Sequence, residues 1–351
     1  MAPTEILANQ IYSNVLNHLD NKEVNPILLT GSSKKKSKIY EKIEKGIFNF
    51  IIGTHAIFQE NLNFSSLAYV IIDEQHRFGV QQRLYLAEKG VNTNILLMSA
   101  TPIPRTLALA QYGEIEQVIL KEKPAFQKPI ITKVSNIDKI KDIEILLKKK
   151  ISNVSQVYWI CPLVEASETQ KYKDVETRFK SLKNIFGSEV EMLHGKIKSD
   201  QKERIIQNFQ KGNIKILVAT TVVEVGIDNK NADYIVIENA EKFGLSQLHQ
   251  LRGRVGRGNN QGYCFALYGK DLPDNTINRL KIFKENLDGF KLSEKDLEIR
   301  GTGDILGYRQ SGDSLFKFVN VYHDQELIID ALQYVKKLIE KKEYELSLIH
   351  I

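Results

Sequence analysis

Two adjacent carboxylates, Asp73 and Glu74, directly follow the apolar run Tyr69–Ile72. The run is short and rich in β-branched residues, which predicts a buried strand. A carboxylate at the end of such a strand can hold Mg²⁺ beside a nucleotide, and a second one can orient and deprotonate an attacking water. The alternative is a buried strand followed by an ordinary polar turn, and these residues alone do not separate the two.

A run rich in arginine and glycine, Gln247–Gly258, is the second candidate for chemistry. Arg254 and Arg257 are three positions apart and would share one face of a helix. Each glycine lowers helix propensity by about 1 kcal/mol relative to alanine, so a purely structural helix rarely carries so many. Arginine stabilises charge on a transferring phosphoryl group. Because an Asp-Glu strand occurs in the other half of the chain, we favour arginine fingers over a basic loop that only contacts DNA or RNA.

Strands that alternate with helices have to position these residues. The first half contains four short apolar runs, at Pro26–Thr30, Phe50–Gly53, Tyr69–Ile72 and Ile95–Ser99. This alternation predicts a parallel α/β sheet, in which ligands bind beyond the carboxyl ends of the strands. Polar residues follow each run at such an end: Thr30–Ser32, Gly53–His55, Asp73–Glu74 and Ser99–Thr101.

The alternation restarts in the second half of the chain. Strands are expected at 156–160, 190–193, 215–219, 234–237 and 262–267. Helices are expected at 138–150, 172–186, 199–209 and around 247–251, with Ser199 as an N-cap candidate. We therefore predict an α/β protein with a first lobe at 1–123, a linker at 124–135, a second lobe at 136–272 and a C-terminal segment at 273–351.

Composition narrows the class of protein. The chain has 351 residues and 42% hydrophobic content, enough for two cores. Lys and Arg number 49 against 43 Asp and Glu, and the net charge of +6 suits a nucleic-acid partner without requiring one. Cys161 and Cys264 sit in apolar runs and are expected to be buried small hydrophobes. Without a transmembrane-length run or a signal-peptide pattern, we expect a cytoplasmic protein with no membrane partner.

Several stretches resemble, in order and spacing, the motifs of the two RecA-like lobes of superfamily-two helicases. They are Ala2–Ala8, Gly53–His55, Asp73–His76, Ser99–Arg105, Ala219–Asp228 and Gln250–Arg257. One stretch is most similar to the RecG family of bacterial ATP-dependent DNA helicases: the sequence Asp-Glu-Gln-His-Arg-Phe-Gly-Val that begins at Asp73. The sister family Mfd, which couples transcription to repair, shares Arg-Phe-Gly-Val and is the alternative.

The resemblance implies roles at a nucleotide. ATP and Mg²⁺ are the implied cofactors, with Asp73 on the metal and Glu74 activating water. The implied catalytic residues are Asp73, Glu74, His76, Arg254 and Arg257. The implied nucleotide-binding residues are Asp73, Glu74, Gly226, Asp228, Arg254 and Arg257.

The resemblance also implies a DNA track and a system that couples the nucleotide to movement. Phosphate contacts along the track would make DNA binding independent of sequence and sensitive to salt. The implied DNA-binding residues are Pro3, Thr4, Glu5, Thr30, Gly31, Gly53, Thr54, His55, His194, Gly195, Thr220 and Thr221. The implied coupling residues are Gln75, Ser99, Thr101, Gln250, Arg300, Gly301, Gly303, Arg309 and Gln310.

The C-terminal part resembles, over Leu297–Gly312, the segment with which RecG and Mfd turn lobe closure into translocation on duplex DNA. Without the resemblance, a structural hairpin would be the preferred interpretation of this glycine-rich stretch. A helix is expected before it at Asn275–Leu287. The stretch Gln325–Lys342 has a helical apolar stripe, which predicts a packing helix.

One expected pattern, the phosphate-binding G-x-x-x-x-G-K-[ST], occurs nowhere in the sequence. We therefore expect an incomplete RecG-type motor, without the phosphate loop and the N-terminal wedge domain, whose first lobe is less stable than its second. The predicted function is that of an ATP-dependent helicase and branched-DNA translocase, acting as a monomer in replication fork remodelling, recombination and repair. A DNA-binding remnant without ATP turnover is the alternative from another class. At Asn229–Lys230, the pattern of the resembling family has an apolar residue and proline. This difference would only change the shape of a loop.

Overall fold

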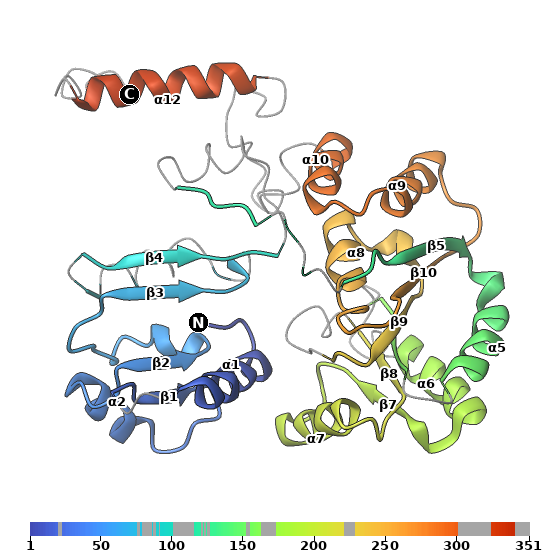
Figure 1. Ribbon diagram of the computed structural model, residues 1–351, viewed down its shortest axis with the longest axis horizontal. Coiled ribbons are helices and arrows are strands. Elements are labelled where there is room, and N and C mark those ends of the chain that lie inside the picture. Colours follow the sequence, from blue (N-terminus) through green and yellow to red (C-terminus); the bar gives the residue numbers. More distant parts are fainter. Residues whose placement is uncertain are drawn as a thin grey trace.

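The computed structural model of the chain describes residues 1–19, 23–75, 78, 86, 89–90, 92–100, 116–120, 122, 124, 127–151, 155–162, 173–220, 229–300 and 324–340. Figure 1 shows two α/β lobes side by side, and helix α12 (Gln325–Glu340) apart from both. The lobes touch, because Ile6 near the start of the first lobe packs against a core cluster of the second. No helix in the described part of the chain combines the length and hydrophobicity that crossing a membrane requires.

The first lobe contains the four predicted strands. Its elements are α1 (Glu5–His18), β1 (Pro26–Leu29), α2 (Lys36–Glu44), β2 (Phe50–Gly53), the 3-10 helix η1 (His55–Phe58), β3 (Tyr69–Ile72) and β4 (Asn94–Leu97). Within the described residues the strands form two separate parallel pairs, β1 with β2 and β3 with β4, instead of one continuous sheet.

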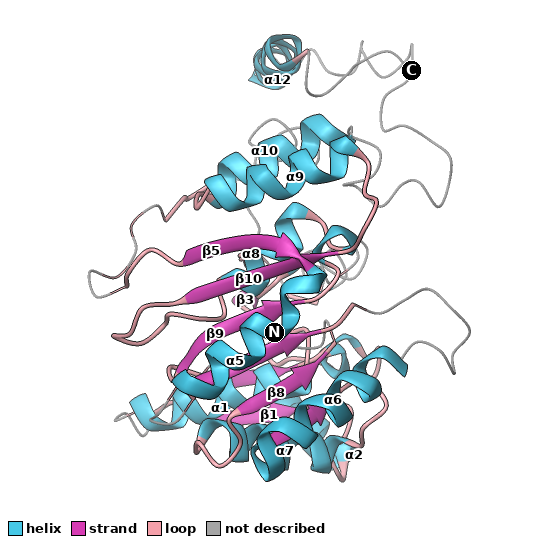
Figure 2. Ribbon diagram, turned by 90° about the vertical axis from the view of Figure 1, so that its right-hand side faces the viewer, coloured by secondary structure: helices cyan, strands magenta, loops and turns pink. Residues whose placement is uncertain are grey.

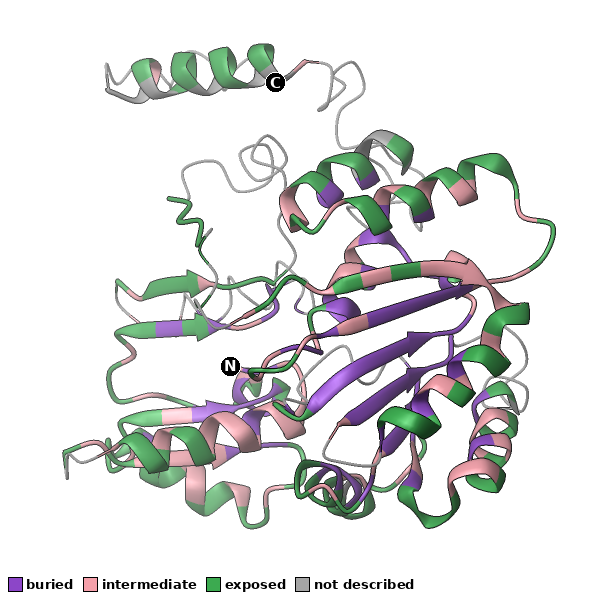
Figure 3. Cartoon of the chain, turned by 45° about the vertical axis from the view of Figure 1, so that its right-hand side comes forward, coloured by how far each residue is buried: buried purple, intermediate pink, exposed green. Residues whose placement is uncertain are grey.

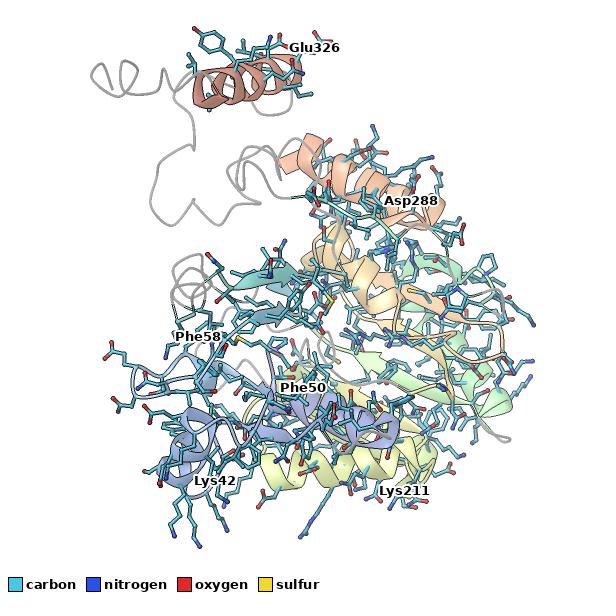
Figure 4. The ribbon with its side chains drawn as sticks, turned by 60° about the vertical axis from the view of Figure 1, so that its left-hand side comes forward. Lys42, Phe50, Phe58, Lys211, Asp288 and Glu326 are labelled. Carbon is cyan, nitrogen blue, oxygen red and sulfur yellow. The ribbon has the colours of Figure 1, made fainter. Side chains whose placement is uncertain are left out.

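A single hydrophobic cluster holds the two strand pairs of the first lobe together. Leu29 of β1 and Ile72 of β3 are fully buried in it, and α2 contributes Ile43. Side chains alternate between the faces of a strand, and Ile52 of β2 accordingly packs on the other face, in a second cluster with Ala8 of α1. Lys42 of α2 is exposed to solvent, as expected of a charged helix face (Figure 4).

The second lobe is built on a six-stranded parallel sheet in the order β5-β10-β9-β6-β8-β7. Its strands are β5 (Ile131–Asn136), β6 (Gln156–Ile160), β7 (Val190–Leu193), β8 (Ile216–Ala219), β9 (Ala232–Ile237) and β10 (Tyr263–Tyr268). The inner strands β6, β8 and β9 are buried along their whole length (Figure 3). Such continuous burial is typical of parallel sheets that are covered on both faces.

Helices cover both faces of this sheet (Figure 2). One face carries α5 (Ile140–Lys150) and α6 (Lys173–Phe186), whose apolar side chains join one core cluster. The other face carries α7 (Ser199–Gln210), α8 (Leu245–Arg252), α9 (Asp274–Glu285) and α10 (Gly289–Arg300), which share the second cluster. The described part of the lobe also contains the short 3-10 helices η3 (Ile137–Lys139), η4 (Gly187–Glu189) and η6 (Ala240–Lys242).

Three local features differ from the sequence-based expectations. Strand β5 overlaps the expected linker 124–135, so the sheet of the second lobe begins at Ile131 and not after residue 135. The expected coupling loop from Leu297 begins as the last turn of α10. Helix α7 does begin at Ser199, but Lys198 occupies the N-cap position, because its backbone is extended there.

Candidate functional site

The carboxylate pair lies where β3 ends, as predicted. Glu74 is only 6% exposed and has a backbone φ of +50°, a conformation that is uncommon for residues other than glycine. The Asp73 side chain accepts a hydrogen bond from Glu74 N at 2.9 Å, which supports this turn. Because strained backbone conformations concentrate at functional sites, the geometry favours a functional role over an ordinary polar turn.

The pairing of β3 with β4 continues beyond the strand ends and fixes the next residues. Met98 N donates to Ile72 O at 2.8 Å, and Gln75 N donates to Met98 O at 3.0 Å. Gln75 is 8% exposed and therefore sits below the surface, whereas Ser99 is exposed. These two predicted coupling residues thus lie next to each other at the end of the β3–β4 pair. His76 and Thr101 lie outside the described residues.

The predicted DNA-binding residues of the first lobe gather beside the ends of β1 and β2. Thr4 caps α1, and its hydroxyl accepts a hydrogen bond from Leu7 N at 3.3 Å. The Glu5 carboxylate accepts hydrogen bonds from Ser32 N at 2.9 Å and from the Ser32 hydroxyl at 3.2 Å. The loop that includes Gly31 is therefore tied to the start of α1.

β2 ends in a tight contact with β1 that only glycine allows. A Cβ atom on Gly53 would lie 2.0 Å from Leu29 O. Thr54 N donates to the same oxygen at 3.3 Å, and Thr54 is buried. His55 is exposed and lies beside Phe78, with 5.0 Å between the ring centroids. The structure thus brings this motif and the turn around Glu5 to one edge of the lobe.

The arginine-rich run does not form one helix, which corrects the expectation of a shared helical face. α8 ends at Arg252, and Arg254 and Arg257 follow in a turn. Gly256 has a φ of +66°, a conformation that favours glycine, and this breaks the helical path. Arg257 Nε donates to Gly253 O at 2.9 Å, which holds its side chain back over the end of the helix.

Arg252, which the sequence analysis did not single out, is the buried member of the run. It is 2% exposed and donates to Phe283 O at 2.9 Å and to Asn286 O at 2.8 Å. A third contact joins it to His249 Nδ1 at 3.0 Å. Burial lowers the pKa of the Arg252 guanidinium. The carbonyls at the C-terminal end of α9 carry partial negative charge, and they favour the charged form of the Arg252 guanidinium.

Other predicted residues of the second lobe lie at the carboxyl ends of β7 and β8. Thr220 is fully buried after β8, and its N–H donates to Leu193 O at 3.4 Å. His194 follows β7, and burial lowers its pKa, an effect that the nearby Glu176 opposes. Gln250 is buried within α8. The remaining predicted site residues, Thr221, Gly226, Asp228, Gly301, Gly303, Arg309, Gln310 and the side chain of Arg300, lie outside the described residues.

A buried polar cluster under the second sheet also escaped the sequence analysis. Trp159 Nε1 and the Arg178 guanidinium both donate to the Glu238 carboxylate, and Arg178 also reaches Glu144 Oε1 at 3.4 Å. Burial raises the pKa of Glu144, and Arg178 opposes this shift. Burial and the Glu238 charge raise the pKa of the Cys161 thiol, so this cysteine is a buried small residue, as predicted. The cluster joins β6 and β9 to α5 and α6.

The acidic and basic halves of the candidate site belong to different lobes. Figure 1 shows the arrowheads of β3 and β4 directed towards the second lobe, where α8 lies on the nearer side. No group of three or more potential metal ligands occurs among the described residues. Mg²⁺ needs no such group, because it is commonly held by one or two carboxylates together with phosphate oxygens and waters. The donor set around Asp73 therefore fits a magnesium–nucleotide complex.

Comparison with known proteins identifies both lobes. A family model described as DEAD/DEAH box helicase matches residues 1–110, and one described as Helicase conserved C-terminal domain matches residues 137–259. The ATP-dependent DNA helicase RecG of Borreliella burgdorferi is 48% identical over 94% of this chain, and that of Staphylococcus epidermidis is 42% identical over 98%. Over nearly its whole length, this chain is similar to RecG helicases.

Solved structures agree with this assignment. A RecG structure bound to a three-way DNA junction matches 93% of this chain at 38% identity and a TM-score of 0.72. The helicase Mss116p, solved with single-stranded RNA and AMP-PNP, matches 95% of the chain at 20% identity and a TM-score of 0.64, which shows the shared fold. The chain spans about half the length of the curated RecG relatives, 48% and 51% of the two named above. The predicted RecG resemblance and two-lobe α/β fold are confirmed.

Proposed function

We propose that this chain contains the two-lobe motor of a RecG-type, ATP-dependent DNA helicase that translocates on branched or forked DNA. The observation that carries the proposal is that the candidate carboxylates and the candidate arginines lie on different lobes. A buried carboxylate follows Asp73 at the end of β3, and the Arg254–Arg257 turn follows α8 in the other lobe. Such a site can respond to closure of the lobes, because neither half suffices for catalysis by itself.

The roles at the nucleotide follow from these positions. Asp73 would hold Mg²⁺, which neutralises charge on the phosphates. Glu74 would accept a proton from the attacking water, since a carboxylate within hydrogen-bond reach of that water can act as a general base. Arg254 and Arg257 would stabilise the charge that develops on the transferring phosphoryl group. Gly226, Asp228 and His76 complete the set that the family resemblance implies.

DNA would lie along the edge formed by the turns after β1 and β2 in the first lobe and after β7 and β8 in the second. Backbone amides and hydroxyls there, including those near Thr4, Thr30 and Thr54, suit the phosphate oxygens of DNA. Such contacts would give binding that does not depend on sequence and weakens with salt. The substrate class is branched DNA, since the solved RecG relative holds a three-way DNA junction.

Movement would be coupled to the nucleotide by residues between the site and the C-terminal segment. Gln75 and Ser99 lie beside the carboxylates, and Gln250 lies in the helix that leads to the arginine turn. The stretch from Arg300 would pass the movement to duplex DNA. We further propose that the motor acts as a cytoplasmic monomer in replication fork remodelling, recombination and repair, with lobes at about 1–123 and 131–272 and a coupling segment after them.

Mg-ATP hydrolysis, measured with and without a three-way DNA junction, tests the proposal. Replacing Glu74 by Gln removes the base but keeps the size of the side chain, so we expect turnover to fall at least about a hundredfold. The matched control is Glu41→Gln, since Glu41 lies on the exposed face of α2 and pairs with Lys45 there. Turnover that the junction stimulates, that Glu74→Gln abolishes and that Glu41→Gln leaves unchanged supports the proposal.

A second candidate is DNA binding without hydrolysis, which the absence of the G-x-x-x-x-G-K-[ST] pattern in the sequence favours. The same assay separates the two functions. Salt-sensitive junction binding without any turnover identifies a binding function for this chain. Turnover that Glu74→Gln leaves intact contradicts the assigned site.

A further inference from the structure

The loop that follows the arginine turn is docked on the start of β9. Gly256 N, inside the turn, donates to Ala232 O at 3.1 Å. Two residues further on, the backbones touch, because a Cβ atom on Gly258 would lie 2.6 Å from Lys230 O. The position of the arginine turn therefore depends on how firmly this loop is held against β9.

Asp233 lies in an irregular part of β9 that faces this loop. Gln156 and Val157, which are neighbours in β6, pair with Ala232 and Tyr234, so the register leaves out Asp233 between them. A bulge of this kind redirects a side chain, and bulges are frequent beside functional sites. The carboxylate of Asp233 is thus free to turn from the sheet to the loop.

The Asp233 carboxylate is buried and held by few groups. Asp233 is 3% exposed, and its Oδ2 accepts hydrogen bonds from Asn260 Nδ2 at 3.0 Å and from the Ser155 hydroxyl at 2.7 Å. Its Oδ1 is buried without a hydrogen-bond partner among the described residues. Because a buried carboxylate is stabilised by the donors around it, losing either bond is unfavourable. We call the bond between the two side chains the Asp233–Asn260 clasp.

The segment before β9 is itself fixed to the core of the second lobe. Asn229 is 4% exposed, its Nδ2 donates to Gln156 Oε1 at 3.0 Å, and its Oδ1 accepts from Asn231 N at 3.0 Å. Gln156 is fully buried and donates to Phe209 O near the end of α7. The start of β9 is therefore a firm support, and the clasp attaches an otherwise exposed loop to it.

We propose that Asp233 and Asn260 are positioning residues that hold Arg254 and Arg257 in place for catalysis. α8 fixes the arginine turn on one side, and the clasp holds the loop on its other side against β9. Arginines that must reach a phosphoryl group need such support, because misplacement by about 1 Å can lower a rate roughly a hundredfold. The inference rests on the proposed roles of the two arginines at the nucleotide.

Reversing the two side chains of the clasp tests the inference in the full 351-residue chain. Asn260→Asp places a second carboxylate against Asp233, and like charges repel. Adding Asp233→Asn to that variant reverses the pair, with the amide on β9 and the carboxylate on the loop, so the bond can form again. The matched control is Asn259→Asp, which adds the same charge at the exposed residue one position earlier.

Two exchange signals report the position of the turn without ATP. The Gly256 amide is bonded to β9, and the Arg257 Nε–H is bonded to Gly253 O. We expect Asn260→Asp to speed hydrogen exchange at both groups by about tenfold, followed by mass spectrometry and nitrogen-15 spectra. Asn259→Asp should leave both signals unchanged, and the reversed pair should restore both.

Mg-ATP hydrolysis with a three-way DNA junction separates positioning from support of the fold. Asn260→Asp should lower kcat by about tenfold or more and leave KM nearly unchanged, because the arginines act on the transition state. The reversed pair should recover most of the loss. Asn260→Ala, which only removes the donor, should change kcat and exchange in the same direction but less.

Each outcome decides the question. Faster exchange and lower kcat in Asn260→Asp, both recovered in the reversed pair and absent in Asn259→Asp, support the proposal. Unchanged exchange at Gly256, or no recovery in the reversed pair, overturns the clasp. A normal kcat despite faster exchange overturns the positioning role. If the unaltered chain shows no ATP turnover, the proposed function fails, whereas the two exchange signals still decide whether the clasp holds the arginine turn.

Discussion

A single methyl group at Gly53 would disturb the pairing of β1 with β2. The added Cβ atom would lie 2.0 Å from Leu29 O and 3.0 Å from Ile57 Cδ1, and the backbone oxygen cannot move away without breaking the pair. We expect Gly53→Ala to destabilise the first lobe by about 1–3 kcal/mol, as overpacking does. Urea unfolding followed by circular dichroism measures the effect.

The control for this prediction is Gly31→Ala in the same lobe. There the added methyl group meets only the Glu5 carboxylate, at 3.1 Å, and a flexible side chain can shift. A loss of stability in Gly31→Ala as large as that in Gly53→Ala would contradict the steric explanation.

His194 makes the second lobe sensitive to acid. Burial lowers the pKa of this side chain below its ordinary value of 6.5, although Glu176 opposes the shift. A lowered folded-state pKa means that the stabilising contribution is present above the unfolded-state pKa and is lost as the pH falls through the folded-state pKa. We expect the urea midpoint of the second lobe to fall from pH 7 to pH 5, and His194→Gln to reduce that fall.

The single tryptophan, Trp159, lies in the second lobe and reports this midpoint by its fluorescence. His18→Gln serves as the control, because His18 is exposed in the first lobe. An undiminished pH dependence in His194→Gln would show that other groups cause it.

At the level of elements, Arg252 joins α8 to α9. Its guanidinium donates to two carbonyls at the end of α9 and lies 4.5 Å from the centroid of the Phe283 ring. We expect Arg252→Met to destabilise the second lobe by about 2–4 kcal/mol, because one buried and one partly buried carbonyl lose charge-assisted bonds. Arg252→Lys is expected to recover only part of this, since lysine lacks the planar fork.

Arg257→Met is the matched control for the change at Arg252. The Arg257 bond to Gly253 O is exposed, so its loss should leave the urea midpoint nearly unchanged while it lowers ATP turnover. The reverse result, a destabilised Arg257 variant beside a stable Arg252 variant, would contradict the division of roles in this run.

The sequence predicted those elements whose signals are local. Short apolar runs located β1 to β4 and β6 to β10. β5 was missed because this edge strand carries exposed polar residues, and such residues after Pro129 are also typical of a linker. α10 was missed because its glycine-flanked stretch resembled a loop. The carboxylate pair was predictable from its place after an apolar run, whereas Arg252 was not, since its partners lie in another helix.

Across the whole molecule, the two lobes differ in how fully their strands are covered. Among the described residues, the first lobe has two-stranded pairs with exposed apolar residues, and the second has a six-stranded sheet buried at its centre. We expect the first lobe to unfold at lower urea concentration, because less apolar surface is buried per residue. Circular dichroism should show a first transition that Trp159 fluorescence does not follow.

Cysteine labelling gives an independent readout of the second transition. Cys161 and Cys264 are both buried in the second lobe, and burial raises the pKa of Cys264 to about 12. Neither thiol should react until the second lobe unfolds, since the thiolate is the reactive form. A single transition shared by all three probes would contradict independent unfolding of the lobes.

The strand order of the second lobe has a consequence for its synthesis. β5 is the first strand of this sheet to leave the ribosome, yet its only neighbour in the described sheet is β10, the last, with Ile131 opposite Tyr263. At about 5–20 residues per second, roughly ten seconds pass before that neighbour exists. During this interval the growing chain carries an unmatched strand that can pair with other nascent chains. The edge of β5 is thus a natural site for a chaperone to shield, and the time of greatest risk for this lobe falls before release from the ribosome.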